Sequence, residues 1–352
     1  MDVRIVGLGT ANPPLRVSQE EVYRAYMELV PLSDKGQDLL RQILLDNKSI
    51  AFRHMGMDDL SDAVSKNSQD ELIARYQKFA IPVAVEAASK ALNQAGLAPD
   101  EVDAIVTNTC TGYLCPGLTS YVAEALSLRK NVKPFDLQGM GCGGAIPALE
   151  TAYNLLHTYP DANVLTLSVE ICTATIVFSE DPAILVSNCI FGDGAAATVL
   201  TNHPGTSGLR LKHFAAGLFP EYRQHLHYRT EGSRLRNVLS QRVPTLGAKC
   251  SKQVADDLLA QSGIGFDDID HWVVHTGGEK VLDAFQRAVD LPDEALVPSR
   301  TVLRNYGNMS SASVLFVLEE TLRGRSHQPG DLILMCSFGA GFSAFATLLE
   351  VL

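Results

Sequence analysis

The stretch Phe135-Asp-Leu-Gln-Gly-Met-Gly-Cys-Gly-Gly-Ala-Ile-Pro-Ala-Leu149 decides the fold. An apolar run over residues 132–137 predicts a strand, glycines follow at positions 139, 141, 143 and 144, and small residues predict a helix over 145–157. Cys142 lies in the turn before this helix, where amide groups without intrahelical acceptors favour a negative charge. Because the thiolate is the nucleophilic form of cysteine, Cys142 is a candidate nucleophile.

Two other interpretations of this stretch are open. A free cysteine is often only a small buried hydrophobic residue. In addition, the glycines at 139, 141 and 144 fit the spacing of a dinucleotide-binding turn, and Glu170 could then bind the ribose of the nucleotide. That glycine spacing alone is weak support, and it would put Cys142 where the pyrophosphate has to lie.

Composition restricts the class of protein. A chain of 352 residues that is 46% hydrophobic can bury a large core, as one domain or as two fused halves. A net charge of −11 argues against nucleic acid or an anionic membrane surface as a general partner. We find no apolar run near the ~20 residues that span a bilayer. Seven cysteines without C-x-x-C spacing predict a reduced cytoplasmic protein with no metal site.

The chain contains an internal duplication. Three pairs of segments match in the same order: Gly96–Thr109 with Gly263–Thr276, Gly139–Ala152 with Asn308–Thr321, and Phe191-Gly-Asp-Gly-Ala with Phe338-Gly-Ala-Gly-Phe. We therefore predict two copies of one α/β unit, an N-terminal half over 1–205 and a C-terminal half over 206–352. The polar residues 204–246 are interpreted as the long connection between them. A dinucleotide fingerprint would be expected near the start of its own domain, so the duplication disfavours that alternative.

The positions where the copies differ are the expected place of the chemistry. His275 in the second copy stands where the first copy has Asn108, and Gly307-Asn-Met-Ser-Ser311 replaces the turn around Cys142. If a pseudo-twofold axis relates the halves, equivalent strand ends converge on one cleft. Cys142, His275 and Asn308 would then meet there.

These residues carry a family resemblance. The combination of Gly141-Cys-Gly-Gly-Ala, Phe191-Gly-Asp-Gly-Ala, His275-Thr-Gly-Gly and Tyr306-Gly-Asn-Met-Ser-Ser-Ala312 resembles the type III polyketide synthases, the chalcone and stilbene synthase-like branch of the thiolase superfamily. The resemblance extends over residues 7–342. It implies a duplicated thiolase-like αβαβα five-layer sandwich, a cytosolic homodimer, and an acyl-CoA starter and malonyl-CoA as substrates. It implies no metal or redox cofactor.

The resemblance also assigns roles to residues. It places the nucleophile on Cys142, its partners on His275 and Asn308, and a gatekeeping aromatic ring on Phe191. It gives the following further positions: substrate-cavity residues Cys172, Thr175, Ser310 and Asn237, and the CoA-phosphate candidates Lys48 and Arg53.

The chemistry expected of the site follows from these roles. We expect a thiolate–imidazolium pair between Cys142 and His275 at neutral pH. The Cys142 amide and the Gly339–Gly341 loop would hold the thioester oxygen. His275 and Asn308 would donate hydrogen bonds to the enolate formed when malonyl-CoA loses CO₂.

Departures from the plant members leave the starter and the product open. Thr276 and Ala340 stand where plant members have proline, and Asn237 and Cys172 differ from the usual cavity residues. A β-ketoacyl carrier-protein synthase III, which stops after one condensation, is the nearest alternative, although that family usually shows His-Gln-Ala-Asn where this chain has His275-Thr-Gly-Gly. A non-catalytic subunit is a further alternative, but such subunits generally lack the nucleophile.

Overall fold

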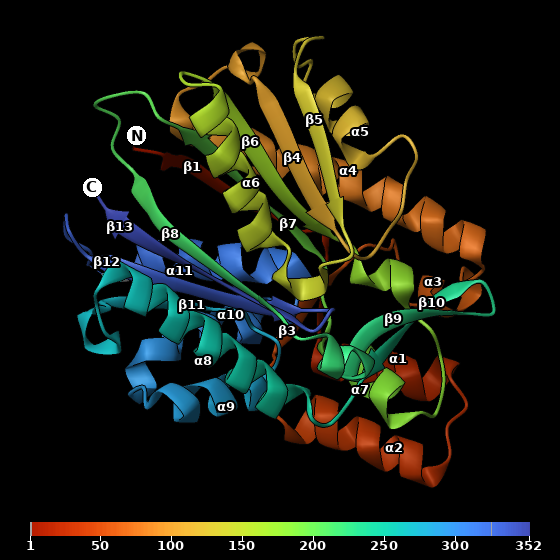
Figure 1. Ribbon diagram of the computed structural model, residues 1–352. Helices are drawn as coiled ribbons and strands as arrows, with labels where there is room; N and C mark the ends of the chain where they lie inside the picture. Colours follow the sequence, from red (N-terminus) through yellow and green to blue (C-terminus); the bar gives the residue numbers. More distant parts are fainter. Residues whose placement is uncertain (1, 325) are drawn as a thin grey trace.

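The strands form a sheet whose order mirrors itself about its middle (Figure 1). The computed structural model describes residues 2–324 and 326–352. From edge to edge the strands are β11 (His271–Val274), β12 (Leu332–Gly339), β13 (Ser343–Val351), β8 (Leu209–Leu218), β1 (Arg4–Ala11), β7 (Gly194–Thr201), β6 (Asn163–Glu170), β4 (Ala104–Thr109) and β5 (Lys133–Gln138). The pairs Arg4–Arg210 and Ile5–Leu209 join β1 to β8, so the sheet consists of two halves with a short junction.

Strand pairing repeats from one half to the other. Outward from the junction, β1–β7 and β8–β13 are antiparallel, and so are β7–β6 and β13–β12. The next pairs, β6–β4 and β12–β11, are both parallel. This repetition agrees with a duplicated α/β unit. The predicted boundary at 205/206 falls in the loop between β7 and β8, and the division into two domains stays a prediction.

Helices complete five layers. Two helices, α6 (Ala145–Thr158) and α11 (Ser313–Gly324), lie between the sheet halves, and their apolar residues form the central core. The outer face of the N-terminal half is covered by α4 (Gln69–Ala95) and α5 (Leu118–Ala125). The outer face of the C-terminal half is covered by α8 (Val243–Ser262) with α9 (Glu279–Val289) beside it (Figure 1). The predicted αβαβα sandwich is confirmed.

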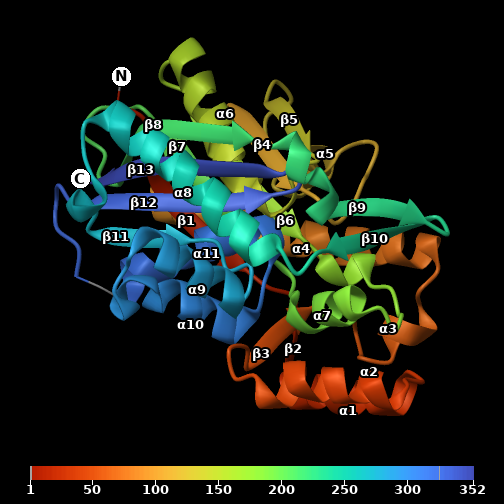
Figure 2. The ribbon, with the colours of Figure 1, turned by 60° about the horizontal axis from the view of Figure 1, so that its bottom comes forward.

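A smaller region lies at the end of the sheet to which the parallel strands point (Figures 1 and 2). It consists of β2 (Leu15–Ser18), α1 (Gln19–Leu29), α2 (Asp34–Arg41), β3 (Phe52–Met55), α3 (Asp62–Ser65), α7 (Pro182–Ile190), β9 (Leu226–Glu231) and β10 (Arg234–Leu239). The hairpin β9–β10 packs beside α7, and α10 (Val297–Tyr306) packs on α11 and β3. Among the described residues, no helix has the length and apolar character needed to cross a bilayer.

Capping residues set both ends of α4. It begins at Gln69 because Ser68 and Glu71 form a capping box, in which each side chain accepts a hydrogen bond from the backbone of the other. Gly96, with φ of 69°, ends the helix in the left-handed conformation that favours glycine.

The interpretation of residues 204–246 as a connection is wrong. The segment contains β8, a central strand, and the hairpin β9–β10. In β8, buried Leu209 and Leu211 alternate with Arg210 and Lys212, so the segment has the mixed composition of a loop. Both cations pair with Glu350 on the neighbouring strand β13, which stabilises the charges inside the sheet.

Close packing of β1 on α4 generates a stability prediction. A Cβ added at Gly7 would lie 2.1 Å from the carbonyl oxygen of Ala91, a backbone atom that cannot rotate away. We expect Gly7→Ala to lower the free energy of unfolding by about 1–3 kcal/mol, since overpacking displaces the helix. Chemical denaturation followed by circular dichroism measures this. Gly265→Ala is the control, because its nearest neighbour would be 3.9 Å away; equal losses for both variants would contradict the packing argument.

Candidate active site

Cys142 lies in a short 3₁₀ turn, Gly141–Gly143, between β5 and α6. Gly141 has φ of 57°, a conformation that favours glycine. The Cys142 side chain is buried, with 9% of the residue exposed. The strand, turn and helix predicted from the sequence are therefore confirmed around the candidate nucleophile.

The turn that joins β12 to β13 packs directly against the Cys142 turn. A Cβ added at Gly339 would lie 2.1 Å from the Met140 carbonyl oxygen and 3.0 Å from the Cys142 backbone nitrogen. A side chain is therefore excluded at 339, and the backbone of this turn lies beside the Cys142 amide. Gly341, with φ of 136°, belongs to the same turn.

Ser310 connects Cys142 to Asn308. Its hydroxyl donates a hydrogen bond to the Cys142 Sγ at 3.3 Å. Its backbone N–H donates to the Asn308 Oδ1 at 2.8 Å. The structure places the Ser310 hydroxyl directly on the candidate nucleophile, and its predicted place in the substrate cavity stays a prediction.

Asn308 is fixed by backbone and side-chain contacts. Its N–H donates to the Ile190 carbonyl oxygen, and its carbonyl oxygen accepts from the Gly192 N–H, each at 2.9 Å, so it pairs with the segment that carries Phe191. Its Nδ2 donates to the Gly277 carbonyl oxygen at 3.4 Å. The carboxamide therefore lies between the Phe191 segment and the residues that follow His275.

His275 comes directly after β11 and is 1% exposed. Its backbone N–H donates to the Cys336 carbonyl oxygen at 3.0 Å, and its ring meets the edge of Phe338 at a centroid distance of 5.7 Å. No described residue bonds the ring Nδ1. The imidazole is thus held by packing and by its backbone rather than by a carboxylate.

Burial changes the ionisation expected for Cys142 and His275. Desolvation raises the pKa of the Cys142 thiol to about 12, although the bond from Ser310 opposes this shift. Desolvation lowers the pKa of His275 to about 4. Both directions favour thiol and imidazole over the expected thiolate–imidazolium pair, because burial outweighs the amide dipoles of the turn. The thiolate–imidazolium pair therefore stays a prediction, and burial of both side chains opposes it in the free protein.

A buried network next to Ser310 was not predicted. The Ser310 hydroxyl also contacts the Cys110 Sγ at 3.2 Å. The Glu170 carboxylate accepts hydrogen bonds from the Thr111 hydroxyl at 2.8 Å, from the Cys110 N–H at 3.1 Å and from the Ser311 hydroxyl. Because its oxygens are engaged and it is fully buried, the alternative role of Glu170 as a ribose ligand is wrong.

Internal symmetry relates this network to the candidate site. The segment match makes Ser311 the counterpart of Cys142, as Asn108 is the counterpart of His275. The Asn108 Nδ2 donates to the Ser311 Oγ at 2.8 Å. The two counterparts therefore touch, which is the arrangement expected of Cys142 and His275 under a pseudo-twofold axis.

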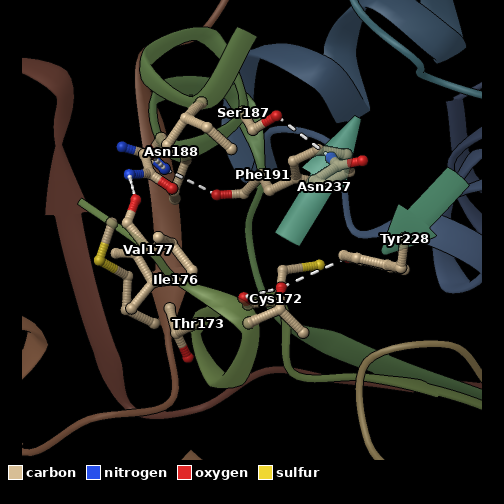
Figure 3. Close-up of a pocket in the computed structure, with 13 residues that line it drawn as sticks. Cys172, Thr173, Ile176, Val177, Ser187, Asn188, Phe191, Tyr228 and Asn237 are labelled. Atoms are coloured by element: carbon tan, nitrogen blue, oxygen red, sulfur yellow. Dashed lines mark hydrogen bonds between the residues drawn. The ribbon is translucent and has the colours of Figure 1, made fainter. Parts of the chain in front are cut away.

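A pocket of about 450 Å³, including its open mouth, brings together four of the predicted substrate residues (Figure 3). These are Phe191, Cys172, Thr175 and Asn237. Tyr228 also lines the pocket, and its hydroxyl contacts the Thr175 hydroxyl at 3.3 Å. The Asn237 Nδ2 donates to the Ser187 hydroxyl at 3.1 Å, which fixes the amide at the pocket wall (Figure 3). Tyr228 was not predicted from the sequence, since its segment was interpreted as a connection.

The two CoA-phosphate candidates have different surroundings. Lys48 is exposed, and its ammonium donates to the Leu45 carbonyl oxygen, so its role stays a prediction. Arg53 is 1% exposed, and its guanidinium donates to Gln19 and to backbone carbonyl groups. The prediction that Arg53 binds CoA phosphates is wrong, because a buried guanidinium cannot reach a phosphate at the surface.

Known proteins resemble this chain over nearly all of its length. The family described as FAE1/Type III polyketide synthase-like protein matches residues 16–215, and the 3-oxoacyl-[acyl-carrier-protein] synthase III C-terminal family matches residues 259–351. A 1,3,6,8-tetrahydroxynaphthalene synthase of Streptomyces peucetius subsp. caesius is 32% identical over 98% of this chain and 92% of its own. A 3,5-dihydroxyphenylacetyl-CoA synthase of Streptomyces toyocaensis is 31% identical over 99% of this chain and 90% of its own.

Solved structures agree with the sequence relatives. The polyketide synthase PKS-I of the brown alga Ectocarpus siliculosus superposes with a TM-score of 0.92 at 25% identity, covering 100% of this chain and 98% of its own. A type III pentaketide synthase of Neurospora crassa superposes with a TM-score of 0.90 at 26% identity, covering 99% of this chain and 100% of its own. With matches over both halves and this geometry around Cys142, the chain belongs to the type III polyketide synthase family.

Proposed function

We propose that Cys142, His275 and Asn308 carry out the condensation chemistry of this polyketide synthase. The enzyme is an acyltransferase that extends a CoA-linked starter by decarboxylative condensation with malonyl-CoA, and CoA thioesters are its substrates without a further cofactor. Ser310 is the observation that carries the residue assignment, since it bonds both the Cys142 sulfur and the Asn308 carboxamide.

Acyl capture begins from the neutral Cys142 thiol and the neutral His275 imidazole. The Cys142 sulfur attacks the carbonyl carbon of the starter thioester while the His275 imidazole accepts the thiol proton. The new sulfur–carbon bond forms, the bond to CoA breaks, and the proton passes to the CoA sulfur. The Cys142 amide, which lies beside Gly339, is placed to donate to the oxyanion of the tetrahedral intermediate.

Decarboxylation needs donors that face the developing enolate. The Asn308 Nδ2 donates weakly to Gly277 at 3.4 Å and can turn to a better acceptor, and the neutral His275 ring carries one N–H. Donors of this kind contribute ~3–4 kcal/mol each to transition-state stabilisation. Phe191 surrounds the malonyl carboxylate with apolar surface, which favours the release of neutral CO₂.

A single-condensation enzyme is the second candidate. It is favoured by the match of residues 259–351 to the 3-oxoacyl-[acyl-carrier-protein] synthase III C-terminal family. The number of malonyl units in the product separates the two, because one extension supports this candidate and several support iterative synthesis. Mass spectrometry of products from a panel of acyl-CoA starters measures that number.

We also propose a cytoplasmic homodimer, on the resemblance to the family. Size-exclusion chromatography with light scattering is expected to give twice the chain mass of 38.1 kDa. A mass of one chain at micromolar concentration would contradict the dimer without affecting the chemistry.

Removal of the nucleophile gives the decisive test of this function. Cys142→Ala is expected to abolish polyketide formation, since no other group captures the acyl chain, whereas Cys142→Gln is expected to keep malonyl-CoA decarboxylation. Product mass spectrometry and release of labelled CO₂ measure the two steps. Cys250→Ala, a change of a buried cysteine on α8, is the control and should leave both steps unchanged. Polyketide formed by Cys142→Ala would disprove the assignment.

Alkylation tests the ionisation state of the nucleophile. With a thiol pKa of about 12, the thiolate fraction of Cys142 rises about tenfold per pH unit between pH 7 and 10. We therefore expect its rate of modification by iodoacetamide, followed by peptide mass spectrometry, to rise without a plateau over that range. The exposed Cys115 provides the reference rate in the same sample. A Cys142 rate that is already constant above pH 7 would show a thiolate–imidazolium pair instead.

A further inference from the structure

Arg53 lies on β3 beneath the Phe191 segment and is almost completely buried. Its Nε donates to the Gln19 Oε1 at 2.9 Å. Its Nη1 donates to the carbonyl oxygens of Asn188 at 2.8 Å and Phe191 at 2.7 Å. A guanidinium has five N–H donors, so three are engaged, and they hold the C-terminal end of α7 in place.

The side chain also supports the segment that carries Asn308. A Cβ added at Gly307 would lie 3.0 Å from the Arg53 Cγ and Cδ. Gly307 has φ of 70°, so the chain can turn over the arginine only with glycine there. Arg53 thus contacts both the Phe191 segment and the residue before Asn308.

The remaining nitrogen of Arg53 is unpaired. No described residue accepts a hydrogen bond from Nη2, and among the described residues no carboxylate lies within 4.0 Å of the guanidinium. Buried donors in native proteins almost always have partners, and a buried charge without one is costly. Arg53 lines the same pocket as Phe191, Cys172 and Asn237, and Nη2 itself is buried, so a ligand in that pocket can supply the missing acceptor once it displaces part of the pocket wall.

We propose that Arg53 Nη2 binds a keto or enolate oxygen of the β-keto acyl chain that grows on Cys142. This inference rests on the proposed function and adds a binding residue to it. The pocket supplies neutral donors in Thr175, Tyr228 and Asn237, and Arg53 is its cationic group. A poly-β-keto chain presents a series of oxygens that become more negative on enolisation, which suits such a set.

The malonyl carboxylate fits this cation less well. A guanidinium next to the carboxylate would stabilise the ground state from which CO₂ leaves, and so would slow decarboxylation. A CoA phosphate is excluded as the acceptor for Nη2, because Arg53 is buried away from the surface where the phosphates would lie. The oxygens of the extended chain are the acceptors that remain among the groups of the reaction.

Matched ligands test the proposal directly. Acetoacetyl-CoA and butyryl-CoA have four-carbon acyl chains and differ in one keto oxygen. In the Cys142→Ala protein, which cannot form the acyl-enzyme, calorimetric titration is expected to show about 10- to 100-fold tighter binding of acetoacetyl-CoA, because a hydrogen bond to a charged donor is involved. Adding Arg53→Lys should reduce that ratio to below threefold, since the lysine nitrogen is needed by the backbone carbonyls.

Arg75→Lys is the control substitution. Arg75 is also buried, and its terminal nitrogens donate to the carbonyl oxygens of Thr173, Asp62 and Lys66. It does not line the pocket. We expect this variant to lose stability as Arg53→Lys does while keeping the preference for acetoacetyl-CoA.

Three outcomes decide between the alternatives. An unchanged ligand preference in Arg53→Lys, as would follow if water completes Nη2, overturns the inference. If Arg53→Lys does not fold, a crystal structure of Cys142→Ala with acetoacetyl-CoA replaces it: a keto oxygen within 3.2 Å of Nη2 supports the proposal, and one bound only to other donors overturns it. A wild-type enzyme that makes no polyketide would instead refute the proposed function, whatever the binding ratio.

Discussion

The contact between the Ser310 hydroxyl and the Cys142 sulfur is the interaction on which the site depends. It joins two equivalent turns, one before α6 and one before α11, so it forms only when these turns meet between the two sheet halves. Gly339 lets the β12–β13 turn approach the same site, because a side chain at 339 would collide with the backbone around Cys142. Packing of the five layers and assembly of the site are therefore the same event, and a shift of one half against the other would separate the two turns.

The duplication places two related clusters of side chains at the site. One contains a buried carboxylate, and the other has none among the described residues. In the first copy, Asn108 bonds Ser311, and Ser311 in turn bonds the buried Glu170 carboxylate. In the second copy His275 takes the place of Asn108, and no described carboxylate bonds its ring. The first network is fully satisfied and suits a structural role. The second leaves a thiol and an imidazole without ionic partners, and their burial favours the neutral form of both.

Local patterns in the sequence predict the duplication and the three central residues, because small residues, glycines and matching segments survive in linear order. They do not predict burial. Arg53 resembles a surface cation in sequence and is enclosed in the structure, and Cys110 has no local signal at all. The same limit applies to ionisation: the turn around Cys142 favours an anion locally, but desolvation of the buried side chain raises the thiol pKa. In β8, charged residues that pair across the sheet hide a central strand.

Burial also divides the pocket into regions with different chemistry. A protein with a net charge of −11 repels CoA and malonate at long range, so recognition of these anions has to be local. The Phe191 ring adds an apolar surface to a pocket that is otherwise lined by both polar and apolar side chains. Beneath the same residue, Arg53 holds the Phe191 backbone and keeps one nitrogen unpaired. Arg53 can therefore serve two purposes at once. Its Nη1 fixes the backbone of Phe191, and its Nη2 is a donor for the oxygens of the growing acyl chain.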